Sequence, residues 1–217
     1  MGKKILPQIA EPLTFCGIPE LMTADVIARA WRKRMLRWTL LGTLPGWSAE
    51  NMLRVGHAVY SMTPMVCGLK IEYTDTARVA DIRVNVERID NRYGTLAYAE
   101  LPNGSDGPLR MMFDTSEEWG DALEPGGHKQ GLIPLVLTWL HESGHSWGLG
   151  HTQNKQSVMY PSLNTGLARW VWQDEDVKVL QSAYGLPTTP APPAPERAAI
   201  LEEAIKDIEA AIAKTKR

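Results

Sequence analysis

The sequence predicts an α+β domain, on three observations. Residues 80–86 alternate apolar and polar side chains, which is typical of a strand with one solvated face. Residues 69–73 and 95–101 also have the character of strands. Residues 48–62 and 132–147 instead repeat apolar side chains at helical spacing. Strands and helices are therefore interspersed along one region of the chain.

The ends of the predicted helices carry capping signals. Ser48 is an N-cap for the first helix, and Pro134 falls in the first turn of the second, where proline is tolerated. Asp174 opens a third helix that ends near Tyr184, where Gly185 is placed to stop it.

Composition narrows the function classes. The chain has 217 residues and a net charge of -2, so neither nucleic acid nor an anionic membrane is a predicted partner. The longest apolar run, residues 132–140, is too short to cross a bilayer. The N-terminus lacks an apolar core and a cleavage site, which predicts no signal peptide and synthesis in the cytoplasm. The final compartment stays open and includes release or packaging in a larger assembly.

Four parts follow one another along the chain. Residues 1–36 form an N-terminal segment, residues 37–187 a compact domain, and residues 188–196 a proline-rich spacer, TTPAPPAPE. Residues 197–217 predict an amphipathic helix. Its narrow apolar stripe consists of Leu201, Ile205, Ile208 and Ile212. The alternatives of an oligomer contact, a docking helix and a frayed charged tail stay open.

The most informative stretch is HESGHSWGLGH, residues 141–151. His141 and His145 are four residues apart, so on a helix they project from one face and reach one zinc ion. Gly148 permits a backbone turn that returns His151 to the same ion as a third ligand. Glu142 follows the first ligand and leans toward the metal without binding it.

This donor set indicates a catalytic rather than a structural zinc. Three imidazoles leave a fourth position open for water, which zinc acidifies. Glu142 is then the general base that passes the water proton to the leaving amine. The alternative is a helix with surface histidines, which does not require a glutamate and a glycine in register. The remaining histidines, His57 and His128, have no ligand partners nearby in sequence and are predicted to be ordinary structural residues.

HESGHSWGLGH and the following SVMYP, residues 157–161, resemble the zinc motif and Met-turn of the matrixins, the matrix metalloproteinase branch of the metzincins. Met159 matches the methionine of that turn. The resemblance covers about 150 residues and also includes RWTL at Arg37 and QDEDVKVLQSAYG, residues 173–185. It implies a zincin-like domain with a mixed, mostly parallel twisted sheet, an active-site helix, a Met-turn and a C-terminal helix. The implied activity is that of a metalloendopeptidase acting on protein or peptide substrates.

The resemblance also implies a substrate groove. YGTLAYAELP, residues 93–102, resembles the edge strand that pairs with an extended substrate. The specificity pocket is expected beside the Met-turn. The substrate-binding residues implied in this way are Thr95, Leu96, Ala97, Tyr98, Ala99, Tyr160, Pro161, Ser162 and Leu163.

Two departures from the matrixin pattern concern further metals. Tyr98 and Met112 stand where two histidines of a structural zinc site would be, so no second, structural zinc is expected. Asp90, Asp114 and Glu117 fall at positions that resemble calcium ligands. Calcium binding and solvated surface acids both stay open for these three residues.

FCGIPE, residues 15–20, resembles the matrixin propeptide motif in which a cysteine thiolate fills the open zinc position. The resemblance implies that Cys16 is a zinc ligand of a latent zymogen, activated when the first 20 to 35 residues are cut or displaced. The arginine that usually precedes the cysteine is replaced by Phe15. The alternatives are a buried thiol and a disulfide with Cys67, whose own predicted role is that of a small core residue.

The prediction is therefore a zinc-dependent endopeptidase that is latent or active. The alternative is a non-catalytic assembly or binding module that uses the zinc fold as a scaffold and the C-terminal helix for attachment. Glu142 argues against this alternative, because a purely structural zinc does not need it.

Overall fold

The computed structural model describes residues 13–14, 16, 30–92, 94–105, 107–120, 132–163 and 171–215. His128 and most of the segment 1–36 lie outside the described residues. The predictions made for them are therefore carried forward only for Cys16 and for residues 30–36.

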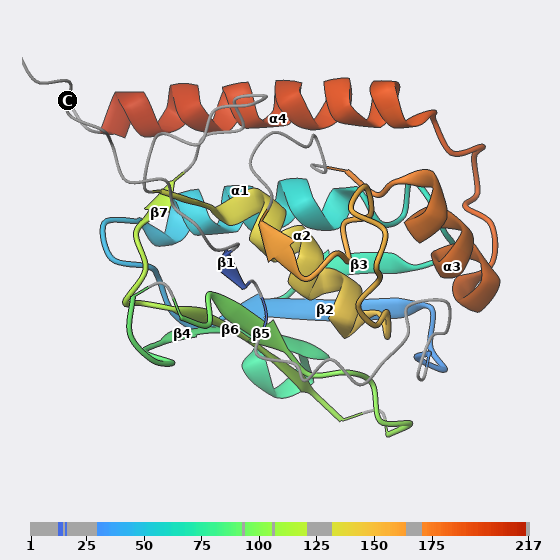
Figure 1. The fold of residues 1–217 in the computed structure, drawn as a ribbon, viewed down its shortest axis with the longest axis horizontal. Coiled ribbons are helices and arrows are strands. Elements are labelled where there is room, and N and C mark those ends of the chain that lie inside the picture. Colours follow the sequence, from blue (N-terminus) through green and yellow to red (C-terminus); the bar gives the residue numbers. More distant parts are fainter. Residues whose placement is uncertain are drawn as a thin grey trace, which may run out of the picture.

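A five-stranded sheet forms the floor of the domain (Figure 1). Its strands, in the order in which they lie side by side, are β3 (Lys70–Tyr73), β2 (Met35–Leu40), β4 (Ile82–Glu87), β6 (Leu109–Asp114) and β5 (Ala97–Ala99). The first four are parallel to one another, and β5 runs antiparallel to β6 at the edge. This mixed, mostly parallel sheet with its helices confirms the predicted α+β fold.

The edge strand β5 is shorter than the strand expected over residues 95–101. Its ladder with β6 spans three residue pairs. Backbone pairing nevertheless continues at both ends, because Asp114 N–H donates to the Leu96 carbonyl at 2.9 Å and Glu100 N–H donates to the Arg110 carbonyl at 2.9 Å. Strand β5 is therefore an edge strand, and no other strand of this five-stranded sheet pairs with the side of β5 that faces away from β6.

Helices α1 (Ala49–Ser61) and α2 (Leu135–Ser146) lie together on one side of the sheet (Figure 1). Ser48 caps α1 as predicted, because its side chain accepts the Asn51 N–H at 3.1 Å. Pro134 precedes α2 at the N-cap position, with φ of -73°. Every residue of α2 is buried, so this helix is the centre of the domain rather than an amphipathic cover.

An aromatic cluster joins the sheet to these helices. Trp38 of β2 packs edge-on against Trp139 of α2, with ring centroids 6.0 Å apart. The ring of Tyr60 of α1 is tilted against Trp38, with ring centroids 4.8 Å apart. Gly56 of α1 faces the Trp38 ring so closely that a Cβ would overlap it. The absence of a side chain at Gly56 therefore lets α1 approach the sheet.

Two more helices follow the active-site region. Helix α3 (Asp174–Tyr184) ends at Gly185, whose φ of 80° belongs to the left-handed region. Helix α4 (Ala194–Thr215) begins inside the predicted spacer and lies alongside α1, above it in Figure 1. Leu201 of the predicted apolar stripe is buried in this contact region. Helix α4 thus covers the side of the α1 layer that faces away from the sheet.

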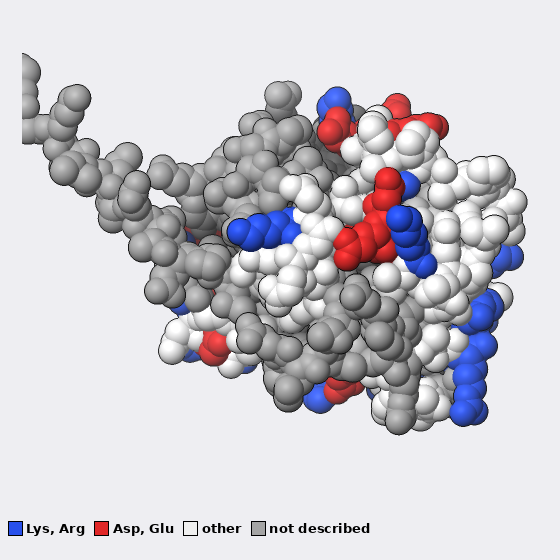
Figure 2. Space-filling model, turned by 45° about the vertical axis from the view of Figure 1, so that its right-hand side comes forward, with Lys and Arg blue, Asp and Glu red and all other residues white. Residues whose placement is uncertain are grey.

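Acidic and basic side chains are both spread over the described surface drawn in Figure 2. Within the part of the chain that the structure describes, no helix combines the length and apolar character needed to cross a membrane.

Candidate metal centre

The imidazole rings of His141, His145 and His151 converge on one point. His145 Nε2 lies 3.2 Å from His141 Nε2 and 3.2 Å from His151 Nε2. The first two rings come from consecutive turns of α2, as their spacing predicts. The third arrives after a turn at Gly148, whose φ of 94° is the left-handed conformation expected of that glycine.

Backbone carbonyls orient two of the rings. His141 Nδ1 lies 2.8 Å from the Val158 carbonyl, and His145 Nδ1 lies 2.8 Å from the Leu149 carbonyl. A carbonyl can only accept, so each Nδ1 carries the proton and each Nε2 presents its lone pair to the centre. This is the arrangement in which metal-binding histidines are held by their outer partners.

The remaining groups at this point are Cys16 and Glu142. Cys16 Sγ and the three histidine ligand atoms all lie within 4.8 Å of one another. Cys16 is buried, and its Sγ lies 3.8 Å from Glu142 Oε2. Burial raises the pKa of Glu142 well above its usual value. Burial, followed by the charge of His151, lowers the pKa of His145 to about 3, so His145 is neutral and able to bind a cation.

Cys16 and Cys67 are not joined by a disulfide. Cys67 is buried and donates to the Thr63 carbonyl at 3.5 Å, as a small core residue would. His57 lies on α1 with its ring against Trp38 and Tyr73.

Met159 lies beneath the histidines and is buried. Its sulfur occupies the space in which a Cβ on Gly144 would lie, between the two histidines of α2. Thr152 N–H donates to the Met159 carbonyl at 3.1 Å, which links this turn to the residue after His151.

Asp176 holds the turn, a role that was not predicted from the sequence. Its carboxylate accepts from Ser157 Oγ at 2.5 Å and from Val158 N–H at 3.1 Å. It also accepts from Gln173 N–H at 3.0 Å, completing a capping box at the start of α3. An acid in the first turn of a helix is ordinarily a solvated complement to the helix dipole, so the local sequence concealed this contact. The signal that could have revealed it is the run of three acids at 174–176, which is more than capping requires.

The expected substrate-binding segments lie on either side of the N-terminal residues. Strand β1 (Leu13–Thr14) pairs antiparallel with β9 (Ser162–Leu163), and Cys16 forms a parallel bridge with Ala97 of β5. Thr95 and Leu96 precede β5, Tyr98 and Ala99 belong to it, and Tyr160 and Pro161 precede β9. Residues 13 and 14 and Cys16 therefore lie between the two walls of the expected groove.

The structure brings two of the three candidate calcium ligands into contact. Asp114 accepts the Asp90 N–H at 3.0 Å and the Ser116 N–H at 2.7 Å. Burial opposes ionisation of Asp114, but the backbone donors more than offset it, so its pKa is lowered. Glu117 is buried three residues further along.

Tyr98 and Met112 are directly opposite each other in the β5–β6 ladder. These two side chains are thus a cross-strand pair.

A helix with two converging histidines, a third histidine delivered by a glycine turn and a methionine packed against that helix are the arrangement expected of a metzincin-type fold. Comparison with known proteins agrees with this class. Residues 30–185 match the family model of the matrixin peptidases, and the chain belongs to that family.

The relatives that the chain matches are longer proteins. It is 28% identical to matrix metalloproteinase-18 of Xenopus laevis, over 82% of this chain and 38% of that protein. It is 30% identical to stromelysin-1 of Rattus norvegicus, over 80% of this chain and 37% of the relative. It is 24% identical to metalloendoproteinase 5-MMP of Arabidopsis thaliana, over 85% of this chain and 46% of that protein. The chain thus spans less than half the length of these curated relatives.

Proposed function

We propose that the chain is a zinc-dependent endopeptidase in which His141, His145 and His151 hold a single zinc ion. The convergence of the three Nε2 atoms carries this proposal. Two of the rings are fixed with their lone pairs facing inward, and such an arrangement of acceptors is repulsive unless a cation lies between them. Nitrogen donors in this number suit zinc.

A bound zinc would acidify a water molecule and polarise the scissile carbonyl. Glu142 follows the first histidine on α2, and its carboxylate reaches the same centre, as its 3.8 Å distance from Cys16 Sγ indicates. Its Oε2 is the atom placed to take up the water proton and deliver it to the leaving amine. Burial holds this carboxyl away from bulk solvent, which favours proton exchange with the substrate.

The substrate would bind as an added strand along the outer edge of β5, with Tyr160, Pro161, Ser162 and Leu163 forming the opposite wall. The observation that supports this is that the chain's own N-terminal residues already pair with both walls, Leu13 and Thr14 with β9 and Cys16 with Ala97. Backbone pairing of this kind accepts many sequences, so side-chain preference would come from the pocket expected between residues 139–141 of α2 and residues 160–163.

The chain would be latent, because Cys16 Sγ lies among the histidine ligand atoms and would take the zinc position that the reacting water needs. A thiolate is a strong zinc ligand. The backbone bridge between Cys16 and Ala97 also blocks the edge of β5 at which a substrate would pair. Trp31 is 2% exposed, and its Nε1 donates to the Ser146 carbonyl at 2.8 Å. An activating cut would therefore fall between Cys16 and Trp31, which leaves this anchor on the catalytic domain.

A calcium ion bound near Asp90, Asp114 and Glu117 is a further proposal. Asp90 Oδ1 is buried and has no hydrogen-bond partner among the described residues, which leaves an oxygen ligand available. Calcium should then raise the melting temperature of the wild-type chain but not that of an Asp90→Asn variant. Equal melting curves with and without calcium would rule this site out.

The alternative of a non-catalytic module attached through the C-terminal helix is less well supported. Arg197 and Leu201 of α4 are both buried against the chain's own domain, so this side of the helix is already used.

The decisive experiment compares three full-length chains on a peptide library: wild type, Cys16→Ala, and Cys16→Ala combined with Glu142→Ala. We expect all three to bind zinc and only Cys16→Ala to cleave rapidly. Loss of the general base should lower the rate by about 10²- to 10⁴-fold.

Each outcome has a separate meaning. Full activity of the double variant, or a wild-type chain that takes up no zinc, would refute the proposed zinc-dependent endopeptidase activity. A wild type as active as Cys16→Ala would refute latency alone.

A further inference from the structure

Helix α4 lies outside residues 30–185, the region that matches the matrixin model. The start of this helix nevertheless contacts residues that pack beneath the candidate metal centre. The contact is made by Arg197 in its first turns. The side chain of Arg197 is 3% exposed, which is unusual for an arginine. An arginine buried to this degree needs partners for its N–H groups, and here Nη1 and Nη2 have them, whereas Nε has none among the described residues.

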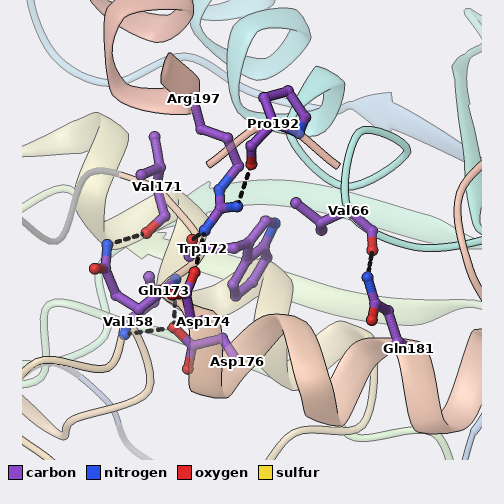
Figure 3. Close-up of polar contacts among 10 residues, drawn as sticks. All are labelled: Val66, Val158, Val171, Trp172, Gln173, Asp174, Asp176, Gln181, Pro192 and Arg197. Carbon is purple, nitrogen blue, oxygen red and sulfur yellow. Dashed lines mark hydrogen bonds and ion pairs between the residues drawn. The ribbon is translucent and has the colours of Figure 1, made fainter. Parts of the chain in front are cut away.

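The partners of Arg197 come mainly from backbone carbonyls (Figure 3). Nη2 donates to the Trp172 carbonyl at 2.7 Å, and Nη1 donates to the Pro192 carbonyl at 2.5 Å. Nη2 also lies 3.1 Å from Asp174 Oδ1. The Asp174 side chain is 81% exposed, so solvent screens this ion pair and the carbonyl bonds are the important ones.

Trp172 connects this guanidinium to the metal-binding helix. Its ring is fully buried and lies against Gly144, where a Cβ would be 3.3 Å from the ring edge. The same glycine faces the Met159 sulfur. The Trp172 ring and the Met159 side chain therefore both pack against the helical turn between His141 and His145.

A second connection runs through α3. Asp174 opens that helix, and Asp176, in the same turn, accepts from Val158 N–H. The Val158 carbonyl in turn orients His141 through Nδ1 at 2.8 Å. Figure 3 shows Asp176 facing Val158 on one side of Gln173, with Arg197 on the other.

We propose that Arg197 is a positioning residue for the metal centre, and that α4 is a built-in brace that fixes Trp172 and the start of α3 against the Met-turn. The link to zinc rests on the function proposed above, whereas the link to the Met-turn does not. Because ligand orientation sets metal affinity, loosening this brace should weaken zinc binding without touching any ligand.

The test uses the full chain with Arg197→Met, which keeps most of the side-chain volume and removes the donors. Two quantities are measured: hydrogen exchange of the backbone amides in residues 157–160, and the zinc dissociation constant by competition with a chelator. We expect faster exchange at 157–160, unchanged exchange in β4, and a zinc dissociation constant raised roughly 10-fold.

Two controls separate positioning from general stability. Gln181→Met removes another side-chain bond of α3, the one donated to the Val66 carbonyl at 2.9 Å, at the end away from the Met-turn. It should lower the melting temperature while leaving exchange at 157–160 and zinc affinity unchanged. Lys206→Met removes an exposed positive charge from the same helix as Arg197 and should change neither quantity.

Wild-type exchange at 157–160 together with wild-type zinc affinity in Arg197→Met would overturn the proposal, even if the melting temperature falls. Should Arg197→Met not fold, Arg197→Lys decides, since lysine keeps the charge but cannot span all three acceptors. In Arg197→Lys, smaller increases in exchange at 157–160 and in the zinc dissociation constant support the proposal, whereas wild-type values of both overturn it. If the wild-type chain itself binds no zinc, the proposed function fails, while the exchange measurement still tests the brace.

Discussion

The sulfur of Met159 lies directly against the backbone of Gly144, in the space that a side chain at Gly144 would need. The methionine beneath the histidines and the glycine between them are thus one packing unit. The turn that carries Met159 can approach α2 only because position 144 has no Cβ.

Gly144→Ala is expected to push the Met-turn away from α2. The Trp172 ring lies on the same side, so the new methyl group cannot be accommodated by a rotamer change of Met159 alone. Overpacking of this kind costs about 1–3 kcal/mol, and here it should also lower zinc affinity. Thermal unfolding with and without zinc measures both effects.

Gly107→Ala is the matched control for that substitution. Among the described residues, a Cβ at Gly107 would meet only Ser105 Oγ, at 3.4 Å, so the melting curve of Gly107→Ala should match wild type. A Gly144→Ala chain with wild-type stability and zinc affinity would show that the turn is not held as tightly as described.

Asp176→Asn should destabilise the chain by about 1.5–3 kcal/mol, the range for hydrogen bonds to a charged group. The buried carboxylate accepts from Ser157, Val158 and Gln173, and an amide would turn an N–H₂ group toward one of these donors. Urea unfolding monitored by tryptophan fluorescence gives the free energy. Asp75→Asn, at an exposed position, should unfold like wild type, and equal midpoints for the two variants would contradict the prediction.

Trp31→Phe should lower the unfolding free energy by roughly 1 kcal/mol or more. Phenylalanine fills most of the same volume but cannot donate to the Ser146 carbonyl at the end of α2, which Trp31 Nε1 reaches at 2.8 Å. The free energy is again obtained from urea unfolding.

A chain cleaved between Cys16 and Trp31 should keep the unfolding free energy of the uncut chain. A lower unfolding free energy after that cut would place the N-terminal boundary of the domain before the cut.

Cys67 should resist alkylation in the folded chain. Burial raises the pKa of its thiol to about 11, and only the thiolate is nucleophilic. Iodoacetamide at pH 8 should therefore modify Cys67 only after denaturation, as followed by mass spectrometry.

The same shift predicts how stability changes in alkali. The unfolded thiol ionises at lower pH than the folded one, so stability should fall as pH rises from about 9 toward 11. A Cys67→Ser variant with the same alkaline profile would show that other groups cause the loss.

Much of the metal centre was predictable from the sequence because its geometry is local. The helical spacing of His141 and His145 and the turn at Gly148 depend only on neighbouring residues, and the fold class and the family predicted from them and from the strand pattern are confirmed. The zinc ligands, Glu142 and Cys16 keep their predicted roles as proposals, now with their atoms gathered at one point.

The supports of this centre depended on tertiary structure. Trp31 reaches Ser146, Asp176 reaches Val158 and Arg197 reaches Trp172 across long stretches of chain, and in each case the local sequence indicated something ordinary. A tryptophan beside basic residues, an acid in a first helical turn and an arginine in a charged tail are all usual on a surface. Sequence patterns report periodicity and local geometry, whereas burial of these polar groups is decided by which distant backbone atoms the fold brings to them.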